Sequence, residues 1–349
     1  MNYEKILLIR FARLGDVILL VPSIRMLRRH FPHAQIDVVA GRRCAPVLGM
    51  CSAVNNVISV NRLEMRDGSK LAAIRNIFRL SERIRKERYD LVLDFHSFRE
   101  TNLLAWYSRA KWRLGLRRTH GAYLPFCFNL NPVLEDKSLH VSSVFLTLLG
   151  PLGIQPTEAN PLLDLCADDL KKADQFLQRY EVSLNDTLIG FNIGAGARSR
   201  MWPLEKFANL APKLNLRFGA RIILLSGPQD EDSSQKASKL MFEHRPVVAH
   251  NLALRELAAI VSRCQVLVSN DTGPMHLGPA VGVPTLGLFS VGYPEHYKPL
   301  GSYSRFLKAN PIERLEVKEV YEHLIEMIEV VKREKAVAQQ TQLSPFVVD

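Results

Sequence analysis

The first side chain suited to chemistry is an aspartate that follows an apolar run near the start of the chain. Ile6–Arg10 has the composition of a buried strand, and Gly15 and Asp16 follow it just before a helical pattern that carries Pro22. Glycine permits a tight turn, and a carboxylate at the start of the helix could take a proton from a hydroxyl group. Aspartate is also a common helix N-cap, and the local sequence alone favours that structural role for Asp16.

Another strand end, in the second half of the chain, carries groups suited to an anion. The segment Ser269–His276 follows an apolar run and opens a helix, with Pro274 near the first helical position. The backbone N–H groups of Thr272 and Gly273 would then point outward from a helix N-terminus, which is a favourable place for phosphate.

A third strand end combines glycines with arginines. In the segment Ile193–Arg200, Gly194 and Gly196 allow close approach of the backbone, while two guanidinium groups could bind anionic oxygens. The third glycine of the dinucleotide-binding fingerprint is absent, because Ser199 stands in its place. A plain glycine turn explains this segment equally well when it is taken alone.

These polar segments need a scaffold that brings strand ends together, and the chain predicts one. Short runs rich in Ile, Val and Leu alternate with amphipathic stretches, which is typical of strand–helix units on a parallel sheet. The predicted strands are Ile6–Arg10, Gln35–Val39, Val57–Val60, Leu91–Phe95, Leu188–Ile193, Arg221–Ser226, Val247–Ala249, Val266–Ser269 and Thr285–Phe289. The predicted helices are Pro22–His30, Leu71–Arg88, Pro203–Phe218, Asp230–Glu243, Leu254–Arg263, Met275–Val281 and Glu316–Lys335. Ligands of such sheets bind beyond the carboxyl ends of the strands.

The length of 349 residues suggests two domains. Dense Gly and Pro between Gly150 and Pro161 favour a linker there. We therefore expect an N-terminal domain over residues 1–155 and a C-terminal domain over 156–338. The polar residues 339–349 are expected to form a disordered tail.

The positive charge lies in the first half of the chain. Residues 1–150 hold 24 Lys and Arg against 12 Asp and Glu, and the remainder holds 22 against 23. Such an imbalance suggests a polyanionic partner, whether nucleic acid, an anionic membrane or a phosphorylated glycolipid. A surface kept soluble by basic residues explains the charge alone about as well.

Several classes of protein lack support in this sequence. No apolar run is long enough to span a bilayer, and the first residues do not resemble a signal peptide, so we expect a cytoplasmic protein. The five cysteines show no C-x-x-C spacing, and His33, His96 and His120 have no metal-ligand spacing. Asp230-Glu231-Asp232 matches a D-x-D metal motif but reads as an acidic helix start. We therefore predict neither a metal ion nor a cofactor.

Taken together, the strand-end segments resemble glycosyltransferase family 9, the ADP-heptose:lipopolysaccharide heptosyltransferases. The matching pieces stand in the family's order, from residue 5 to about 330: Arg13–Val17 with Pro22, Gly194–Arg200 with Trp202-Pro203, Ser226–Pro228 followed by acids, and Asn270–His276. The resemblance implies an α/β GT-B fold, in which two Rossmann-like parallel-sheet domains face one another across a cleft. It also implies an inverting, metal-independent transfer of a heptose or related sugar from an ADP-sugar to a hydroxyl of the lipopolysaccharide inner core.

The resemblance assigns roles to individual residues. Asp16 matches the base that deprotonates the acceptor hydroxyl, in the domain that binds the acceptor. Arg200 stands where the family's pattern has a lysine that contacts the diphosphate, and the two side chains differ in geometry. The other donor-binding residues implied are Gly194, Gly196, Asp230 or Glu231 near the ribose, Asp271 near the sugar hydroxyls, Thr272 and Gly273 at the diphosphate, and His276 beside that loop.

A series of arginines completes the predicted acceptor side. Arg75, Arg79, Arg83 and Arg85 recur at helical spacing, Arg117 could add to this series, and Arg13 follows the first predicted strand. We expect Arg13, Arg75, Arg79 and Arg117 to meet an anionic glycolipid like lipid A with Kdo sugars. The same charges would hold the enzyme peripherally on the inner face of the cytoplasmic membrane.

Two alternatives use some of the same features. A nucleic-acid-binding protein would use the basic half, but the sequence shows neither an aromatic platform nor a recognition-helix motif, so we expect no nucleic-acid partner. An NAD-dependent oxidoreductase would use the same kind of sheet, but it lacks the intact glycine fingerprint and its acidic partner.

Overall fold

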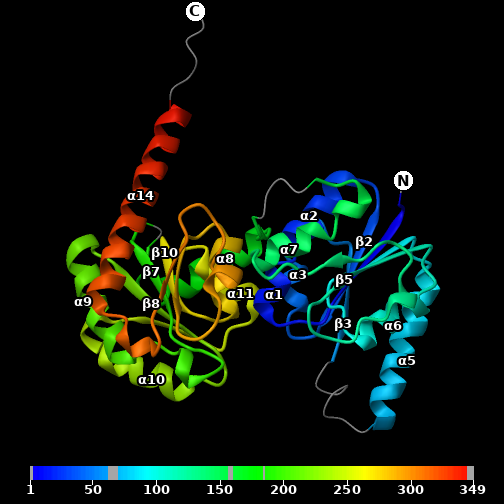
Figure 1. Ribbon diagram of the computed structural model, residues 1–349. Coiled ribbons are helices and arrows are strands. Elements are labelled where there is room, and N and C mark those ends of the chain that lie inside the picture. Colours follow the sequence, from blue (N-terminus) through cyan, green and yellow to red (C-terminus); the bar gives the residue numbers. More distant parts are fainter. Residues whose placement is uncertain (1–2, 62–69, 156–159, 184, 344–349) are drawn as a thin grey trace, which may run out of the picture. The chain divides into compact units, whose positions relative to one another are not determined.

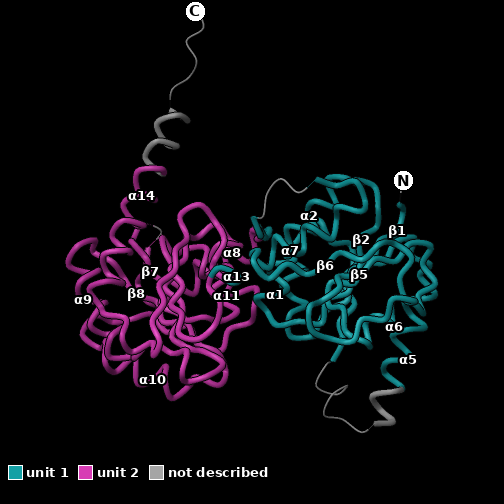
Figure 2. Tube along the Cα trace, in the orientation of Figure 1, with its two compact units in different colours: residues 1–164, 295–297 teal, residues 165–294, 298–349 magenta. Residues whose placement is uncertain are grey.

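The computed structural model describes residues 3–61, 70–155, 160–183 and 185–343, and it divides into two compact units (Figures 1 and 2). The first unit runs through Asp164 and also includes Glu295–Tyr297, while the second contains the rest of the described chain. The first unit therefore extends past the predicted boundary at residue 155. Asp164 stays with it because Arg25 Nη2 binds both carboxylate oxygens at 2.7 and 2.8 Å, and the Asp164 N–H donates to the Met50 carbonyl.

The first unit contains a six-stranded parallel sheet in the order β3-β2-β1-β4-β5-β6. Its strands are β1 (Lys5–Arg10), β2 (Gln35–Gly41), β3 (Asn56–Val60), β4 (Leu91–Asp94), β5 (Trp112–Arg117) and β6 (Val133–Leu134). Its helices are α1 (Leu14–Ile18), α2 (Val21–His30), α3 (Ala45–Leu48), α5 (Lys70–Glu87), α6 (Arg99–Tyr107) and α7 (Val141–Thr147), with 3-10 turns η1 (Pro125–Cys127) and η2 (Gly150–Leu152).

The second unit repeats the plan with a six-stranded parallel sheet in the order β12-β11-β10-β7-β8-β9. Its strands are β7 (Leu188–Asn192), β8 (Arg221–Ser226), β9 (Val247–His250), β10 (Val266–Asn270), β11 (Thr285–Phe289) and β12 (Arg305–Lys308). Its helices are α8 (Ala167–Gln178), α9 (Leu204–Phe218), α10 (Glu231–Leu240), α11 (Leu254–Val261), α12 (Gly273–Ala280) and α14 (Val317–Leu343), with η3 (Arg198–Arg200), η4 (Phe242–His244) and η5 (Ile312–Arg314). Helix α13 (Pro294–Tyr297) ends in the residues that belong to the first unit.

The α/β class with two Rossmann-like parallel sheets is confirmed. Central strands such as β1 and β10 are buried along nearly their whole length because helices cover both faces of each sheet. Helix α14 continues through Leu343, beyond the predicted end at Lys335 and into the segment expected to be disordered. Residues 344–349 of that predicted tail lie outside the described range. Among the described residues, no helix is both long and apolar enough to cross a membrane.

Both sheets reverse the direction in which strands are added. From β1 the chain adds β2 and β3 on one side, and it then returns to add β4 on the other; β7 and β10 are related in the same way. The loops that follow such a strand pair diverge to opposite faces, which leaves room for a ligand beyond the carboxyl ends. Of the predicted site residues, Asp16 follows β1, and Arg200 and Asp271 follow β7 and β10.

A fully buried polar side chain ends each returning strand. Asp94 ends β4 and accepts the backbone N–H groups of His96 and Ser97 at 3.0 and 2.8 Å. Asn270 ends β10; its amide donates to the Ile193 carbonyl at 2.9 Å, and its oxygen accepts the Trp202 N–H at 3.0 Å. Each side chain therefore shapes a loop at the carboxyl edge, and Asn270 ties the loop after β7 to β10.

We predict that Asn270→Ala lowers the free energy of unfolding by about 3 kcal/mol, because it leaves a buried N–H and a buried carbonyl without partners. Urea unfolding of the full chain measures this change. The control is Asn215→Ala, since the Asn215 amide makes one bond of 3.2 Å to the Ala220 carbonyl from an exposed position. Equal losses in the two variants would show that Asn270 does not hold the loop.

Stability should also depend on the protonation of Asp94. Burial raises the pKa of this carboxyl to about 6, although bonds to Ser97 and Asn102 oppose the rise. The folded protein then holds the proton more tightly than the unfolded chain, so the contribution of Asp94 is most favourable below about pH 4 and declines as the pH rises through about 6. Relative to Asp94→Asn, wild type should lose about 2 kcal/mol between about pH 4 and pH 6, and about 3 kcal/mol from well below pH 4 to well above pH 6. A difference that is independent of pH would contradict this.

Candidate functional site

The loop after β1 places Asp16 at the carboxyl edge of the first sheet. Asp16 is the third residue of α1, whose N-cap is Arg13, so its carboxylate does not cap the helix. Arg10, the last residue of β1, donates from Nη2 to Asp16 Oδ1 at 2.7 Å. The Asp16 side chain is 22% exposed, which leaves the carboxylate within reach of a ligand hydroxyl.

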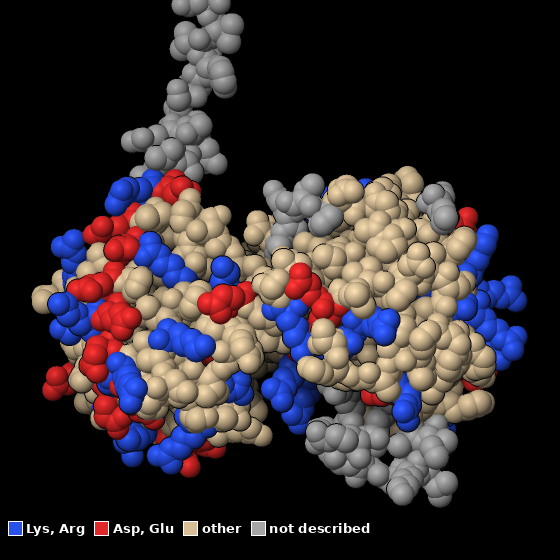
Figure 3. Space-filling model, in the orientation of Figure 1, with Lys and Arg blue, Asp and Glu red and all other residues tan. Residues whose placement is uncertain are grey.

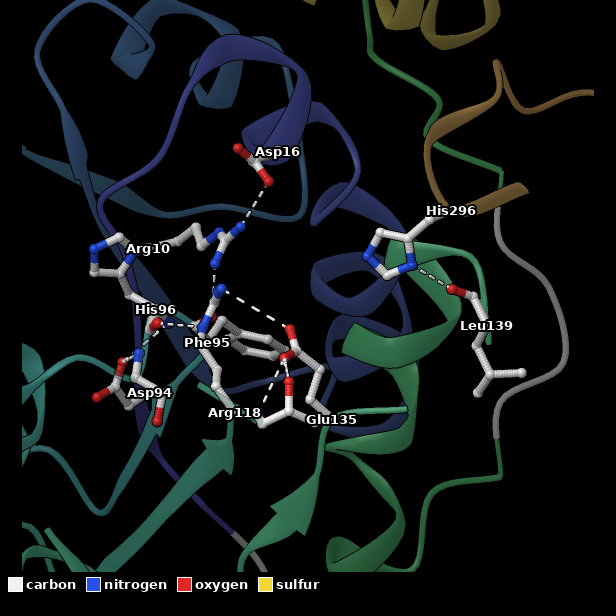
Figure 4. A network of polar contacts seen from close by, with 11 residues as sticks. Arg10, Asp16, Asp94, Phe95, His96, Arg118, Glu135, Leu139 and His296 are labelled. Atoms are coloured by element: carbon white, nitrogen blue, oxygen red, sulfur yellow. Dashed lines mark hydrogen bonds and ion pairs between the residues drawn. The ribbon is translucent and has the colours of Figure 1, made fainter. Parts of the chain in front are cut away.

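Arg10 is almost completely buried, at 4% exposure, and contacts with neighbouring residues hold its side chain in place. Its Nη1 donates to the Phe95 carbonyl at 2.9 Å (Figure 4). Its guanidinium lies over the Phe145 ring at 4.7 Å. These contacts come from the loop after β4 and from α7. Because they hold Arg10, they also fix the position of the Asp16 carboxylate.

A second arginine lies next to Arg10. Arg118, just after β5, donates from Nε to the His96 carbonyl at 2.8 Å, and its Nη1 lies 3.9 Å from Glu135 Oε1 (Figure 4). Burial, followed by the charge of Arg10, lowers the pKa of Arg118. The first unit therefore concentrates two partly desolvated cations beside Asp16, which suits an acceptor that carries negative charge.

The residues Glu295–Tyr297 also contribute to the first unit. His296 Nδ1 lies 2.6 Å from the Leu139 carbonyl. Burial, with a smaller effect of the Asp16 charge, raises the pKa of Tyr297. The short helix α13 therefore adds a phenol and an imidazole to the first unit, and no local sequence pattern predicted this.

The arginines predicted for the acceptor lie in two different places. Arg13 and Arg117 are exposed at the carboxyl ends of β1 and β5, on the same edge as Asp16. Arg75 and Arg79 lie on the exposed side of α5, which leads into β4. The structure therefore groups Arg13 and Arg117 with Asp16, and it places Arg75 and Arg79 on a helix surface.

In the second unit, buried amides organise the loop after β10. Asn192, the last residue of β7, donates to Ser269 Oγ at 2.8 Å and to Thr272 Oγ1 at 2.9 Å. Thr272 is the N-cap residue of α12, but its side chain makes no capping bond to that helix. The first-turn amides of α12, which include that of Gly273, are therefore oriented by the protein and suited to an anionic oxygen.

Arg200, the last residue of η3, contacts the loop after β10. Its Nη1 lies 3.3 Å from the Asp271 carbonyl and 3.4 Å from Asp271 Oδ2. Burial raises the pKa of Asp271, and the charge of Arg200 opposes the rise. Both side chains remain about one-fifth exposed, so the pair can exchange partners with a ligand.

The glycines and acids predicted for donor binding adjoin this pair. A Cβ on Gly194 would lie 2.1 Å from Asp230 Oδ2, and one on Gly196 would lie 3.2 Å from Arg200 Nη2. Asp230 Oδ2 accepts the Gly227 N–H at 3.1 Å, which closes the loop after β8. The absence of a side chain at Gly194 thus leaves room for the Asp230 carboxylate. Glu231, the next residue, is exposed in the first turn of α10.

His276 is buried in the helix that follows the loop after β10. It lies inside α12 and is 5% exposed. This burial favours a role in holding α12 over direct contact with phosphate. In the part of the chain that the structure describes, no three His, Cys, Asp or Glu side chains gather as they would around a metal ion.

Sequence reasoning named Asp16, Arg200 and Asp271 but missed the residues that hold them. Arg10, Asn192 and Asn270 each end a mostly apolar strand, and all three are less than 5% exposed. A polar residue at the last position of a central strand is the signal that would have found them, because only a partner at the carboxyl edge can satisfy it.

The chain is similar over most of its length to known proteins. Residues 77–322 match the model of glycosyltransferase family 9 (heptosyltransferase). The chain is 26% identical over 315 residues to lipopolysaccharide heptosyltransferase 2 of Salmonella typhimurium, covering 87% of this chain and 88% of the relative.

Solved structures agree with the GT-B assignment. A glycosyltransferase family 9 protein of Veillonella parvula superposes with a TM-score of 0.84 at 26% identity, covering 94% of this chain and 98% of the other. The Escherichia coli ADP-heptose lipopolysaccharide heptosyltransferase II gives a TM-score of 0.76 at 21% identity, covering 94% and 99%. With its family model matched over most of its length, this chain belongs to glycosyltransferase family 9, the heptosyltransferase family, and is a glycosyltransferase.

Proposed function

We propose that the protein transfers a heptose or a related sugar from an ADP-sugar to a hydroxyl group of the lipopolysaccharide inner core, with inversion at the anomeric carbon and without a metal ion or cofactor. The names of the relatives support the sugar and the acceptor class. The observation that carries the proposal is the Asp16 carboxylate, fixed by Arg10 at the switch point of the first sheet.

The reaction uses the carboxylate as a base. Asp16 takes the proton from the acceptor hydroxyl as its oxygen attacks the anomeric carbon, and the bond between that carbon and the diphosphate oxygen breaks with its electron pair on the diphosphate. A single displacement of this kind inverts the configuration. Arg10 is a positioning residue, because it holds Asp16 without contacting the substrate.

The second unit would bind the donor. Arg200 and the first-turn amides of α12 offer positive charge and N–H donors to the diphosphate, which gains negative charge as it leaves. These groups would do the work that a divalent cation does in other enzymes. Glu231 and Asp271 remain candidates for the ribose and sugar hydroxyls.

The first unit would bind the acceptor. Arg13, Arg117 and Arg118 lie at its carboxyl edge and suit the acidic sugars and phosphates of a lipid A–Kdo-like glycolipid. Because that substrate is anchored in lipid, we also propose a cytoplasmic enzyme bound peripherally to the inner face of the cytoplasmic membrane. No nucleic-acid partner is proposed.

Replacing Asp16 by Asn should lower the rate of transfer roughly 100-fold or more, because the amide cannot take the proton. The Kd for ADP, measured by calorimetry, should be unchanged, since that site lies in the second unit. Circular dichroism and unfolding temperature report whether the variant folds. Near-normal transfer by folded Asp16→Asn would eliminate this residue as the base.

Replacing Arg200 by Ala should raise the Kd for ADP roughly 10-fold to 100-fold, the usual effect of losing a charge-assisted hydrogen bond. Arg198→Ala is the matched control, because Arg198 is exposed in the same 3-10 turn. Calorimetric titration with ADP compares the three proteins. Equal affinity in wild type and Arg200→Ala would remove Arg200 from the donor site.

A further inference from the structure

Exposed apolar side chains gather on helices α5 and α6 and on the turn η1 of the first unit. They are Ile77 and Phe78 on α5, Leu103 and Trp106 on α6, and Phe126 on η1, with exposures of 39, 59, 42, 49 and 62%. Buried residues such as Ile84 and Leu104 anchor the opposite sides of these helices in the core. The outward side chains are therefore not needed to fill the interior.

Contacts between α5, α6 and η1 place these side chains on one surface. The Tyr107 hydroxyl at the end of α6 donates to Glu82 on α5, and the Arg85 guanidinium lies 5.4 Å from the Tyr107 ring. Phe78 and Leu103 each lie one helical turn before this junction, so they are level with one another. The Trp106 and Phe126 rings meet edge to face at 6.2 Å.

Basic residues surround the apolar ones. Arg75, Arg79 and Arg83 are exposed at four-residue spacing along α5, and Arg109 and Lys111 are exposed just after α6. Figure 3 shows basic side chains gathered along the edge of the first unit that carries these helices. Of the acidic residues nearby, Glu82 is engaged by Tyr107 and Glu87 by Lys5, while Glu100 is exposed.

We propose that this α5–α6 face, made of Ile77, Phe78, Leu103, Trp106 and Phe126 with Arg75, Arg79 and Arg83, docks on the surface of an anionic phospholipid bilayer. Arginines meet the anionic headgroups, while the apolar and aromatic side chains enter the boundary between headgroups and acyl chains. Nucleic acid would use the charges but leave the aliphatic side chains exposed. The combination of both kinds of side chain therefore favours lipid.

The face also adjoins the edge that holds Asp16. Helix α6 begins directly after the carboxyl end of β4, and Phe98, just before it, lies 5.3 Å from the Arg118 guanidinium. Docking through α5 and α6 would thus bring a lipid-anchored acceptor next to this edge. That last step rests on the proposed function, whereas binding to the bilayer does not.

Vesicle binding tests the proposal directly. Full-length protein is sedimented with vesicles of phosphatidylcholine, with or without phosphatidylglycerol, at low and high salt. Three proteins are compared with wild type: Phe78→Ser/Trp106→Ser/Phe126→Ser, Arg75→Gln/Arg79→Gln/Arg83→Gln, and the control Phe242→Ser. Phe242 is a matched control because it is 79% exposed in the second unit.

Wild type and Phe242→Ser should bind the anionic vesicles equally. The arginine variant should lose roughly 100-fold in partitioning at low salt and less at high salt, where charges are screened. The aromatic variant should lose roughly 10-fold or more at both. Anionic vesicles should also shift tryptophan emission to shorter wavelength in wild type, and the shift should vanish in Trp106→Phe.

Wild-type binding by the aromatic variant would overturn the proposal. The proposal would also be overturned if wild type formed a dimer that the aromatic substitutions convert to monomer. Salt-sensitive binding to duplex RNA without binding to vesicles would overturn it as well. Transfer to a deacylated, water-soluble acceptor should be unchanged in the aromatic variant. Failure of transfer in all proteins, with vesicle binding intact, would count against the proposed function alone.

Discussion

The structure depends on a constraint of parallel sheets, which leave room for a ligand beyond their carboxyl ends where the order of strands reverses. In both units the central strands are buried on both faces, so a charged or amide side chain within them needs a partner inside the protein, as Asp37 of β2 has in Asn56 and Tyr89. Beyond the ends of β1 and β4, and of β7 and β10, the loops diverge and donors and acceptors become available. Asp16 and Arg200 both lie beyond such a reversal, Asp16 in the first unit and Arg200 in the second.

The two units stabilise their buried polar side chains in different ways. The first buries the cation Arg10 and offsets the cost of desolvation with Asp16, a backbone carbonyl and the face of Phe145. The second relies on neutral amides, since Asn192 and Asn270 orient the loop that holds Asp271 and Thr272. A fixed carboxylate in the first unit and a set of N–H donors in the second suit the two halves of the proposed displacement, in which one group loses a proton and another gains negative charge.

Much of this could be predicted from the sequence, because apolar runs and glycine-rich strand ends are local signals. The boundaries of β1, β8 and β11 follow the predicted runs closely. β5, β6 and β12 were not predicted, since β5 contains two arginines, β6 has only two residues and β12 is a short strand that begins and ends with a basic residue. The pairing of Arg10 with Asp16, the contact of Gly194 with Asp230 and the face formed by Phe78 and Trp106 depend on tertiary packing, which no local pattern records.

The most direct test of the central claim is the stereochemistry of the product formed from ADP-heptose and a Kdo–lipid A acceptor in the presence of EDTA. A carboxylate base acting in a single displacement predicts that ADP is released in step with transfer. It also predicts a glycosidic bond, observed by NMR, whose anomeric configuration is inverted relative to the donor. A product with retained configuration, or transfer that stops when the metal is chelated, would contradict the roles given to Asp16 and Arg200.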